Sequence, residues 1–293
     1  MKHAFMIMAY NNWDQLKMLI SLLDDSRNSI YVHVDAKSSD FSPSYFNNAV
    51  SHATLTFIPR IKVTWGGSSQ IDCEITLLKH ALESHSDYYH LLSGMDLPLH
   101  AMDYIDDYFQ QRAGLEFIQF GQLGDSVDVR IRDRISTYHP LENILGKKFP
   151  KITFASEILQ RNLHVDRLRR CEDVLLGKGA NWFSITDDFA RYTVSQWPKY
   201  RQMFVSSLCA DELFLQTIVV NSPFRGNIYH PRPDDDYEAI ARLIEWNNGH
   251  LHTFGIDDFG KLTGSTRLFA RKFDERVDDD IIASIAQYVK QES

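Results

Sequence analysis

The sequence predicts an α/β fold with a mostly parallel central sheet that helices flank. Two observations predict it. Short apolar runs alternate with helix-like segments over residues 3–120, and such alternation is typical of parallel sheets covered by helices. In addition, polar side chains such as Asn11, Asp35 and Asp96 follow three of the apolar runs directly. Ligands of such sheets bind beyond the carboxyl ends of the strands, so we expect a nucleotide-type crevice there.

Each element is predicted from the spacing of its apolar residues. Apolar or alternating runs rich in β-branched and aromatic residues indicate buried strands. We expect strands at 3–10, 30–35, 54–58, 88–92, 117–120 and 181–186. Apolar residues three and four positions apart indicate amphipathic helices. We expect helices at 13–23, 69–83, 102–111, 187–197 and 281–290.

The middle of the chain interrupts this regular order. Residues 129–134 alternate like a strand with one solvated face, and 157–176 has a helical, arginine-rich pattern. We expect this charged region to carry acceptor specificity. No linker, repeat or low-complexity tract separates a second unit. The sequence therefore predicts one domain over 1–293, with a nucleotide-binding half at 1–120 and an acceptor and catalytic half at 121–293.

Composition excludes several classes of protein. A chain of 293 residues with 44% hydrophobic residues can bury a large core. Its net charge of −8 argues against a general nucleic-acid binder. Three widely spaced cysteines (Cys73, Cys171 and Cys209) form neither a disulfide framework nor a zinc cluster. The apolar run at 4–10 is too short for a membrane span and has no cleavage site. We therefore expect a cytoplasmic protein.

An acidic pair, Asp211 and Glu212, opens the strongly apolar segment that follows it. A helix should begin there, and its unpaired N–H groups would favour the two acids. One interpretation is that the pair simply caps a core helix. The other is that an acid at the lip of a cleft removes a proton from a substrate hydroxyl. This stretch alone leaves both open.

Cation-binding and phosphate-binding motifs are weak. The chain lacks the glycine-rich turn of dinucleotide folds and the Gly-Lys-Ser/Thr of a phosphate loop. The runs Asp234–Asp236 and Asp278–Asp280 are typical of solvated surface loops. His33 and Asp35 follow a strand and could bind a metal in principle. No histidine and cysteine spacing indicates structural zinc.

Seven blocks along the chain carry a family resemblance. They are 9–12, 31–38, 65–69, 90–99, 178–186, 206–218 and 268–274. In this order they resemble the core-2/I-branching N-acetylglucosaminyltransferase family, which also contains peptide O-xylosyltransferases, and this chain looks like a bacterial-type member. The resemblance implies a GT-A-type fold and an inverting transfer from a UDP-sugar. It also implies that no divalent metal and no other cofactor is required.

The resemblance assigns roles to individual residues. Glu212 would be the general base, and Arg271 and Lys272 would bind the diphosphate. Nucleotide contacts would come from Ala9, Tyr10, Asp35 and Lys37. Contacts to the donor or acceptor sugar would come from Trp65, Gly66, Asp96, Trp182 and Asp211. The chain departs from the pattern at Gly249, where animal members carry a second phosphate-binding arginine. His250, His252 or Arg271 would have to take over that task.

We expect the donor to be a UDP-sugar, with GlcNAc favoured and xylose, galactose or glucose as alternatives. The acceptor would be a saccharide or a lipid-linked oligosaccharide of surface polysaccharide synthesis, at the inner face of the membrane. Residues 158–168, with Arg161, Arg167, Arg169 and Arg170 in or beside them, are the candidate for a peripheral membrane contact. One rival is a retaining or metal-dependent transferase that uses His33 and Asp35 as metal ligands. Another is a non-catalytic protein that binds a nucleotide sugar.

Overall fold

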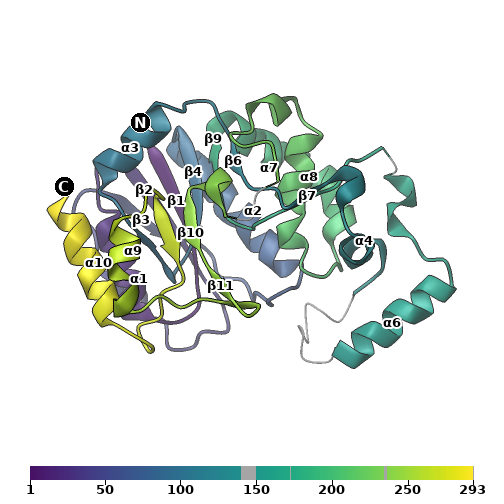
Figure 1. Ribbon diagram of the computed structural model, residues 1–293, viewed down its shortest axis with the longest axis horizontal. Coiled ribbons are helices and arrows are strands. Elements are labelled where there is room, and N and C mark those ends of the chain that lie inside the picture. The colour runs from purple at the N-terminus through teal and green to yellow at the C-terminus, as the bar shows by residue number, and fades with distance from the viewer. Residues whose placement is uncertain (140–149, 172, 234–235, 293) are drawn as a thin grey trace.

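The computed structural model describes residues 1–139, 150–171, 173–233 and 236–292 (Figure 1). Its centre is a six-stranded sheet of order β3-β2-β1-β4-β9-β6. The strands are β1 (His3–Ala9), β2 (Asn28–Val34), β3 (Thr54–Phe57), β4 (Tyr88–Ser93), β6 (Phe117–Ile118) and β9 (Phe183–Thr186). The first four run parallel, and β9 is antiparallel to both its neighbours. The predicted α/β architecture with a mostly parallel sheet is confirmed.

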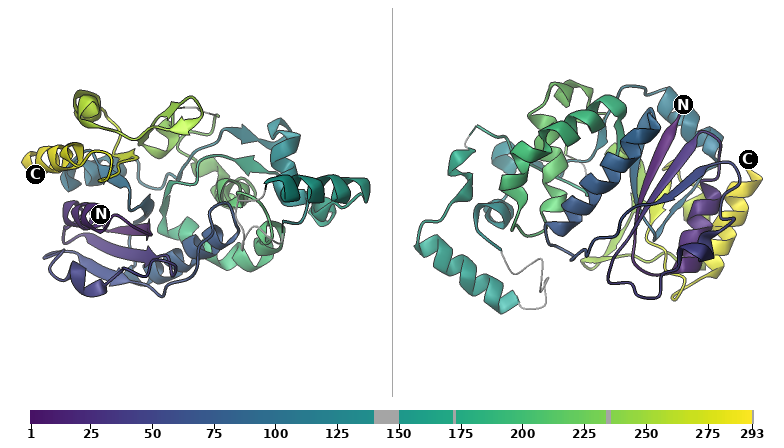
Figure 2. Two further views of the ribbon diagram at one scale, coloured as in Figure 1. Left: turned by 90° about the horizontal axis from the view of Figure 1, so that it is seen from below. Right: turned by 180° about the vertical axis from the view of Figure 1, so that it is seen from behind.

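Two hydrophobic cores lie on opposite faces of this sheet. Alternate residues of a strand point to opposite faces, so Ala4 and Met6 of β1 enter one core while Phe5 and Ile7 enter the other. Helices cover both faces (Figure 2). The first core packs against α2 (Ser69–Ala81), α7 (Asp187–Phe204) and α8 (Phe214–Val220). The second packs against α1 (Trp13–Leu22), α3 (Met102–Gln110) and α10 (Asp280–Gln291).

A small second sheet joins the C-terminal region of the chain to β5 (Asp96–Pro98), the strand that follows β4 of the main sheet. It has the order β10-β13-β5 and consists of β5, β10 (Arg242–Ile244) and β13 (Phe269–Arg271). β13 is antiparallel to β5, and β5 follows β4 almost directly. Arg271 is thereby brought opposite Asp96. The remaining elements near it are α9 (Phe259–Thr263) and the ribbon of β11 (Trp246–Asn247) and β12 (His250–Leu251).

The predictions for the middle region are wrong in two places. Residues 129–134, expected as a strand, belong to helix α4 (Val129–Ser136). Asp128 caps this helix by accepting a hydrogen bond from the Arg130 N–H (2.8 Å), and Ile131 and Ile135 lie four residues apart, on one helical face. The helix expected at 157–176 is instead α6 (Pro150–Asn162), followed by a separate 3-10 turn at Arg167–Arg170. A short ribbon, β7 (Gln122–Leu123) with β8 (Gly177–Lys178), closes the region.

The acidic pair does not open α8. Asp211 and Glu212 lie in a short 3-10 turn, Ala210–Glu212, and α8 begins only at Phe214. Leu213, with φ −126° and ψ −35°, separates the two. The local preference for acids at a helix start therefore did not predict the helix boundary correctly, because the chain turns once before the apolar helix enters the core.

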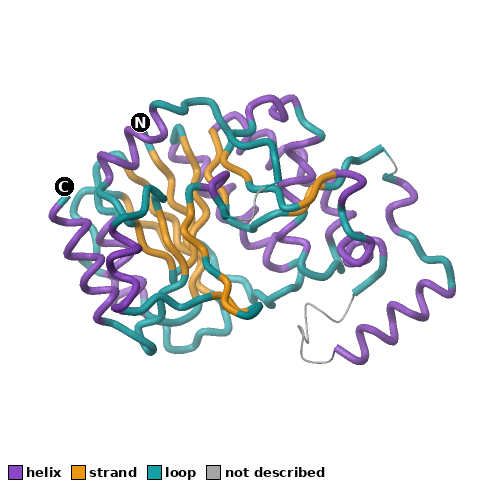
Figure 3. The backbone as a smooth tube through the Cα atoms, in the orientation of Figure 1, coloured by secondary structure: helices purple, strands orange, loops and turns teal. Residues whose placement is uncertain are grey.

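Helix α6 projects from the body of the molecule (Figure 3). Its polar side faces inward, since Gln160 exchanges hydrogen bonds with the backbone of Tyr138 and Arg161 pairs with Asp133. Its apolar residues face solvent, with 44–66% of their surface exposed: Phe154, Ile158, Leu159 and, just past the helix, Leu163. Among the described residues, no helix is both long and apolar enough to cross a bilayer.

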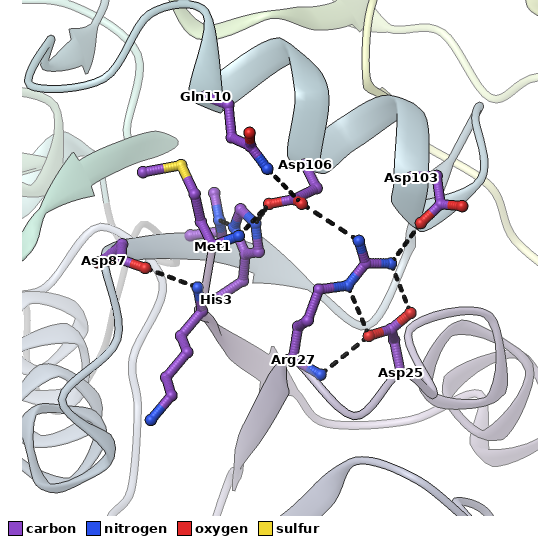
Figure 4. Close-up of polar contacts among 10 residues, drawn as sticks. Met1, His3, Asp25, Arg27, Asp87, Asp103, Asp106 and Gln110 are labelled. Atoms are coloured by element: carbon purple, nitrogen blue, oxygen red, sulfur yellow. Dashed lines mark hydrogen bonds and ion pairs between the residues drawn. The ribbon is translucent and has the colours of Figure 1, made fainter.

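A charged cluster ties the amino-terminal ends of β1 and β2 to α3 (Figure 4). Asp106 of α3 accepts hydrogen bonds from His3 (3.0 Å), Arg27 (3.2 Å) and Gln110 (2.8 Å). Burial raises the pKa of Asp106, but hydrogen bonds from the amino terminus of Met1 (2.7 Å), His3 and Gln110 outweigh it and lower the pKa to about 2. The cluster is structural, and it leaves the carboxyl ends of the strands as the place for a ligand.

Candidate functional site

A cavity of about 550 Å³ lies at the carboxyl ends of β1, β2 and β4. We call it the donor pocket. Eight residues singled out from the sequence line it: Ala9, Tyr10, Asp35, Lys37, Trp65, Trp182, Arg271 and Lys272. Four others named with them (Gly66, Asp96, Asp211 and Glu212) are not among its lining residues. The pocket takes residues from both halves of the chain, because β13 returns to the main sheet.

The end of β2 presents a carboxylate in a fixed orientation. The side chain of Asp35 accepts hydrogen bonds from the N–H groups of Lys37 (2.9 Å) and Val63 (3.4 Å). Its own N–H donates to Ala9 O (2.9 Å), which holds the ends of β1 and β2 together. Lys37 Nζ lies 3.4 Å from the second carboxylate oxygen. A carboxylate fixed in this way can accept hydrogen bonds from a bound nucleoside.

His33 lines the same wall but is poorly suited to bind a metal. Burial lowers its pKa to about 4, so the ring is neutral at pH 7. Its Nε2 accepts a hydrogen bond from the Ile61 N–H (3.0 Å), which leaves the proton on Nδ1 and no free lone pair. Within the described ranges, no three His, Cys, Asp or Glu side chains gather closely enough to hold a metal ion.

Arg271 carries the main positive charge of the pocket. Its guanidinium carbon lies 3.8 Å from the centre of the Trp182 ring, and its Nε is 3.6 Å from Asp96 Oδ1. Only 12% of the side chain is exposed, and burial lowers its pKa. Among the described residues, Nε and Nη1 have no hydrogen-bond partner. Buried guanidinium donors are normally satisfied. Since Nε faces Asp96, Nη1 is the buried donor that is suited to an anionic ligand such as a phosphate.

Asp96 supports Arg271 from behind. It is fully buried, accepts a hydrogen bond from the Ser93 N–H (3.1 Å) and lies opposite Arg271 in the β5–β13 pairing. Burial raises its pKa, and the charge of Arg271 opposes that rise. In this position Asp96 orients the guanidinium over Trp182.

Lys272 follows Arg271 at the end of β13 and also lines the pocket. Its N–H donates to His252 O (3.3 Å), and its carbonyl accepts from the Phe254 N–H (2.9 Å). His252 pairs with Asp258 (2.9 Å). Gly249 lies in the exposed turn between β11 and β12, and His250 is the first, exposed residue of β12. None of these three lines the pocket, so Arg271 and Lys272 supply its cationic end.

The loop before α2 joins the donor pocket to the acidic turn. Gly66 has φ +79°, a conformation that favours glycine, and its N–H donates to Gln70 Oε1 (3.0 Å). Gln70 in turn donates to Asp211 Oδ2 (2.9 Å). Trp65, 67% exposed, lies at the rim. Gln70 therefore places Asp211 directly behind the pocket wall.

Glu212 lies beyond that wall, between two cations. Its carboxylate is 3.0 Å from Arg134 Nη1 and 3.8 Å from Lys178 Nζ, and 37% of the side chain is exposed. Its backbone carbonyl accepts from the Gly179 N–H (2.9 Å). An exposed carboxylate in this setting can accept a proton from a hydroxyl that approaches from solvent. Of the run Asp234–Asp236, residues 234 and 235 lie outside the described ranges, and Asp236 pairs with Arg267 and does not line the donor pocket.

Several site residues were missed from the sequence. Gln70, Ser93 and Asn181 line the pocket, although no individual role was assigned to them. Ser93 and Asn181 lie within the blocks 90–99 and 178–186, and Gln70 directly follows the block 65–69. Glu74 did carry a signal, because it lies on the apolar face of α2, three residues after Ile71. It is fully buried, and burial together with the charge of Asp211 raises its pKa well above the usual range. A buried carboxyl group with a raised pKa therefore lies close to Asp211 and Asn181.

This chain is similar to known proteins over most of its length. The family model "Core-2/I-Branching enzyme" matches residues 3–263. Xylosyltransferase 1 of Rattus norvegicus is 22% identical, with 94% of this chain and 34% of that protein covered. The chain thus spans a minor part of that relative's length. The Homo sapiens beta-1,3-galactosyl-O-glycosyl-glycoprotein beta-1,6-N-acetylglucosaminyltransferase 3 is 20% identical, with 98% and 68% covered. The solved mouse xyloside xylosyltransferase 1, in its apo form, is 9% identical, with a TM-score of 0.37 and 92% and 96% covered.

Proposed function

Because the chain belongs to the Core-2/I-branching enzyme family, we propose that it transfers a sugar from a UDP-sugar to a saccharide hydroxyl. The observation that supports this most directly is the cationic end of the donor pocket. There, the buried Nη1 of Arg271 lacks a hydrogen-bond partner among the described residues, and Lys272 lines the same pocket. UDP carries two phosphates, and its charge rises as it leaves. Fixed positive groups aimed at that charge lower the barrier.

We propose an inverting mechanism without a metal ion. Glu212 takes the proton from the acceptor hydroxyl, and the acceptor oxygen forms a bond to the anomeric carbon. The bond from that carbon to the diphosphate oxygen breaks, and UDP leaves with the electron pair. Arg271 and Lys272 then neutralise the leaving diphosphate, the arginine through its planar fork and the lysine as a point charge. Asp211, held by Gln70, is the alternative base.

The donor sugar is proposed from the activities of the named relatives. We favour GlcNAc, and UDP-xylose is the principal alternative, with galactose and glucose less favoured. Named relatives include both a β-1,6-N-acetylglucosaminyltransferase and xylosyltransferases. The pocket volume of about 550 Å³ is suited to a nucleotide sugar, but volume alone does not select the sugar.

We place the acceptor among saccharides, and we favour a lipid-linked oligosaccharide of surface polysaccharide synthesis at the inner face of a membrane. The outward apolar side of α6 supports a peripheral membrane contact. Anionic headgroups would be attracted by exposed arginines of neighbouring elements. These are Arg130 and Arg132 of α4 and Arg169 of the 3-10 turn after α6.

The test is UDP release from a panel of UDP-sugars with simple acceptor sugars, with and without EDTA. We expect one donor to be consumed with EDTA present. Glu212→Gln should lower kcat by about 10²–10⁴-fold and leave UDP binding unchanged. Glu83→Gln, at an exposed glutamate of the turn after α2, is the control.

Other outcomes would change specific parts of the proposal. Loss of activity in EDTA would show that the reaction needs a metal ion and would contradict the metal-independent mechanism. A kcat loss in Asp211→Asn but not in Glu212→Gln would make Asp211 the base. If Glu212→Gln and Asp211→Asn each retain full activity, neither residue of the acidic turn is the general base. Tight UDP-sugar binding without turnover of any donor would favour a non-catalytic binding protein.

A further inference from the structure

A second cavity, of about 450 Å³, lies at the amino-terminal ends of β10 and β13. Ala241 and Arg267, which precede these strands, form one wall, and the last turns of α3 form another. It shares no lining residue with the donor pocket. From Arg267 to Arg271 the chain runs along β13, about 13 Å at the usual rise per strand residue. The two cavities are therefore separate sites at opposite ends of one short strand.

The charges of this second cavity balance. Its charged lining residues are two acids, Asp107 and Glu238, and two arginines, Arg112 and Arg267. Arg267 is also paired with Asp236 (3.1 Å). Unlike the donor pocket, the cavity thus presents no excess of either sign among its described lining residues. An uncharged polar ligand fits it better than a nucleotide or another anion.

Three tyrosines give the cavity flat apolar surfaces with polar edges. Tyr104 is 44% exposed and stacks on His100, with ring centres 4.1 Å apart. The Arg112 guanidinium covers the Tyr108 ring at 4.0 Å, and Tyr229 lies beside them. Tyrosine presents an apolar ring and a hydrogen-bonding hydroxyl together. A pyranose ring has the complementary chemistry, because one face carries C–H groups and its edge carries hydroxyls.

We propose that this second cavity binds an uncharged oligosaccharide, a part of the acceptor chain distant from the reacting hydroxyl. Planar carboxylate and guanidinium groups would hydrogen-bond adjacent sugar hydroxyls, while Tyr104 packs against a ring face. The acceptor role rests on the proposed function. The binding itself does not, because it uses none of the donor-pocket residues.

The experiment is titration of the full chain with chitotriose, cellotriose and xylotriose, followed by saturation-transfer NMR and calorimetry with saturating UDP present. At least one trisaccharide should bind. Tyr104→Ala and Arg267→Ala should each weaken it about fivefold, the usual effect of losing one aromatic or polar contact. Tyr45→Ala is the matched control, since Tyr45 is similarly exposed (43%) and does not line this cavity.

The proposal fails if none of the three trisaccharides binds, or if both variants bind as the parent does. It fails equally if UDP displaces the trisaccharide, which would place binding in the donor pocket. UDP release with small acceptors tests the proposed function independently. An inactive protein that still binds a trisaccharide through Tyr104 would retain this site, and an active protein that binds none would lose it.

Discussion

Arg271 shows how one residue acquires a function from its surroundings. Trp182 lies against one face of its guanidinium, Asp96 holds Nε at 3.6 Å, and the pocket lies at its open side. Stacking and a carboxylate together fix the plane of the fork. A lysine at the same place would keep the charge and lose both constraints.

We therefore expect Arg271→Lys to weaken UDP binding about tenfold, the loss of roughly one charge-assisted hydrogen bond. Isothermal calorimetry with UDP measures this directly. Arg191→Lys, an arginine of α7 paired with Asp187 outside the pocket, should bind UDP as the parent does. Unchanged UDP affinity in Arg271→Lys would mean that charge alone matters at this position.

At the scale of elements, the close approach of two segments decides whether the acidic turn is in place. Gly179 follows β8, and its N–H reaches the carbonyl of Glu212. A Cβ at this glycine would lie 1.8 Å from Gln119 O, a backbone atom that cannot move aside alone. The absence of a side chain is what allows the segments around Gln119 and Gly179 to meet.

Gly179→Ala should lower the free energy of unfolding by about 1–3 kcal/mol, the range for overpacking, and should reduce turnover by displacing Glu212. Urea unfolding and UDP release measure the two effects. Gly226→Ala is the control, because nothing lies within 4 Å of a Cβ built there. Equal stability of both variants would show that the segments separate without cost.

The apolar side of helix α6 is exposed, and no other described residue covers it. If it contacts a membrane, replacing both Leu159 and Leu163 by serine should reduce binding to anionic vesicles by up to about a thousandfold. Each buried leucine contributes about 2 kcal/mol, and about 1.4 kcal/mol corresponds to a factor of ten. The melting temperature should not change, because both side chains are exposed in the folded protein.

Vesicle co-sedimentation with phosphatidylglycerol measures this binding. Val277→Ser removes a similarly exposed apolar residue elsewhere (67% exposed) and should have no effect. If the parent chain does not sediment with vesicles, or the double variant sediments equally well, α6 is not a membrane contact.

For the whole molecule, buried histidines link stability to pH. His33 has a folded pKa of about 4 because it is buried, whereas an unfolded histidine titrates near 6.5. Between these values the unfolded chain binds a proton that the folded chain does not. Stability therefore falls as the pH falls from 6.5 towards 4, by up to about 3 kcal/mol for this group.

His33→Gln should flatten this part of the pH profile, whatever it does to stability at pH 7. Urea unfolding at pH 4.5, 5.5, 6.5 and 7.5 gives the slope, and His164→Gln, at an exposed histidine, provides the control. A slope in His33→Gln equal to that of the parent would show that the ring is already protonated in the folded state.

The regular parts of this molecule could be read from the sequence. Strands β1, β2 and β4 and helices α1, α2 and α10 agree with their predicted ranges to within a few residues, because each buries a long apolar face whose period is local. The order of strands in the sheet does not follow from that pattern. Residues 129–134 show the limit: alternation over six residues suits a strand, and only the Asp128 cap and the packing of Ile135 select a helix.

For the site, the sequence by itself determined which polar residues end the strands, so Tyr10, Asp35 and Lys37 were predicted and do line one pocket. Its family blocks likewise pointed to Arg271 and Lys272. Only the tertiary structure decided that Asp96 lies behind Arg271, that Gln70 and Asn181 form the wall, and that Glu212 lies outside it beside Arg134 and Lys178. The reason is physical. Strand ends follow from the burial of neighbouring residues, but these contacts join segments far apart in the chain, which meet only in the packed tertiary structure.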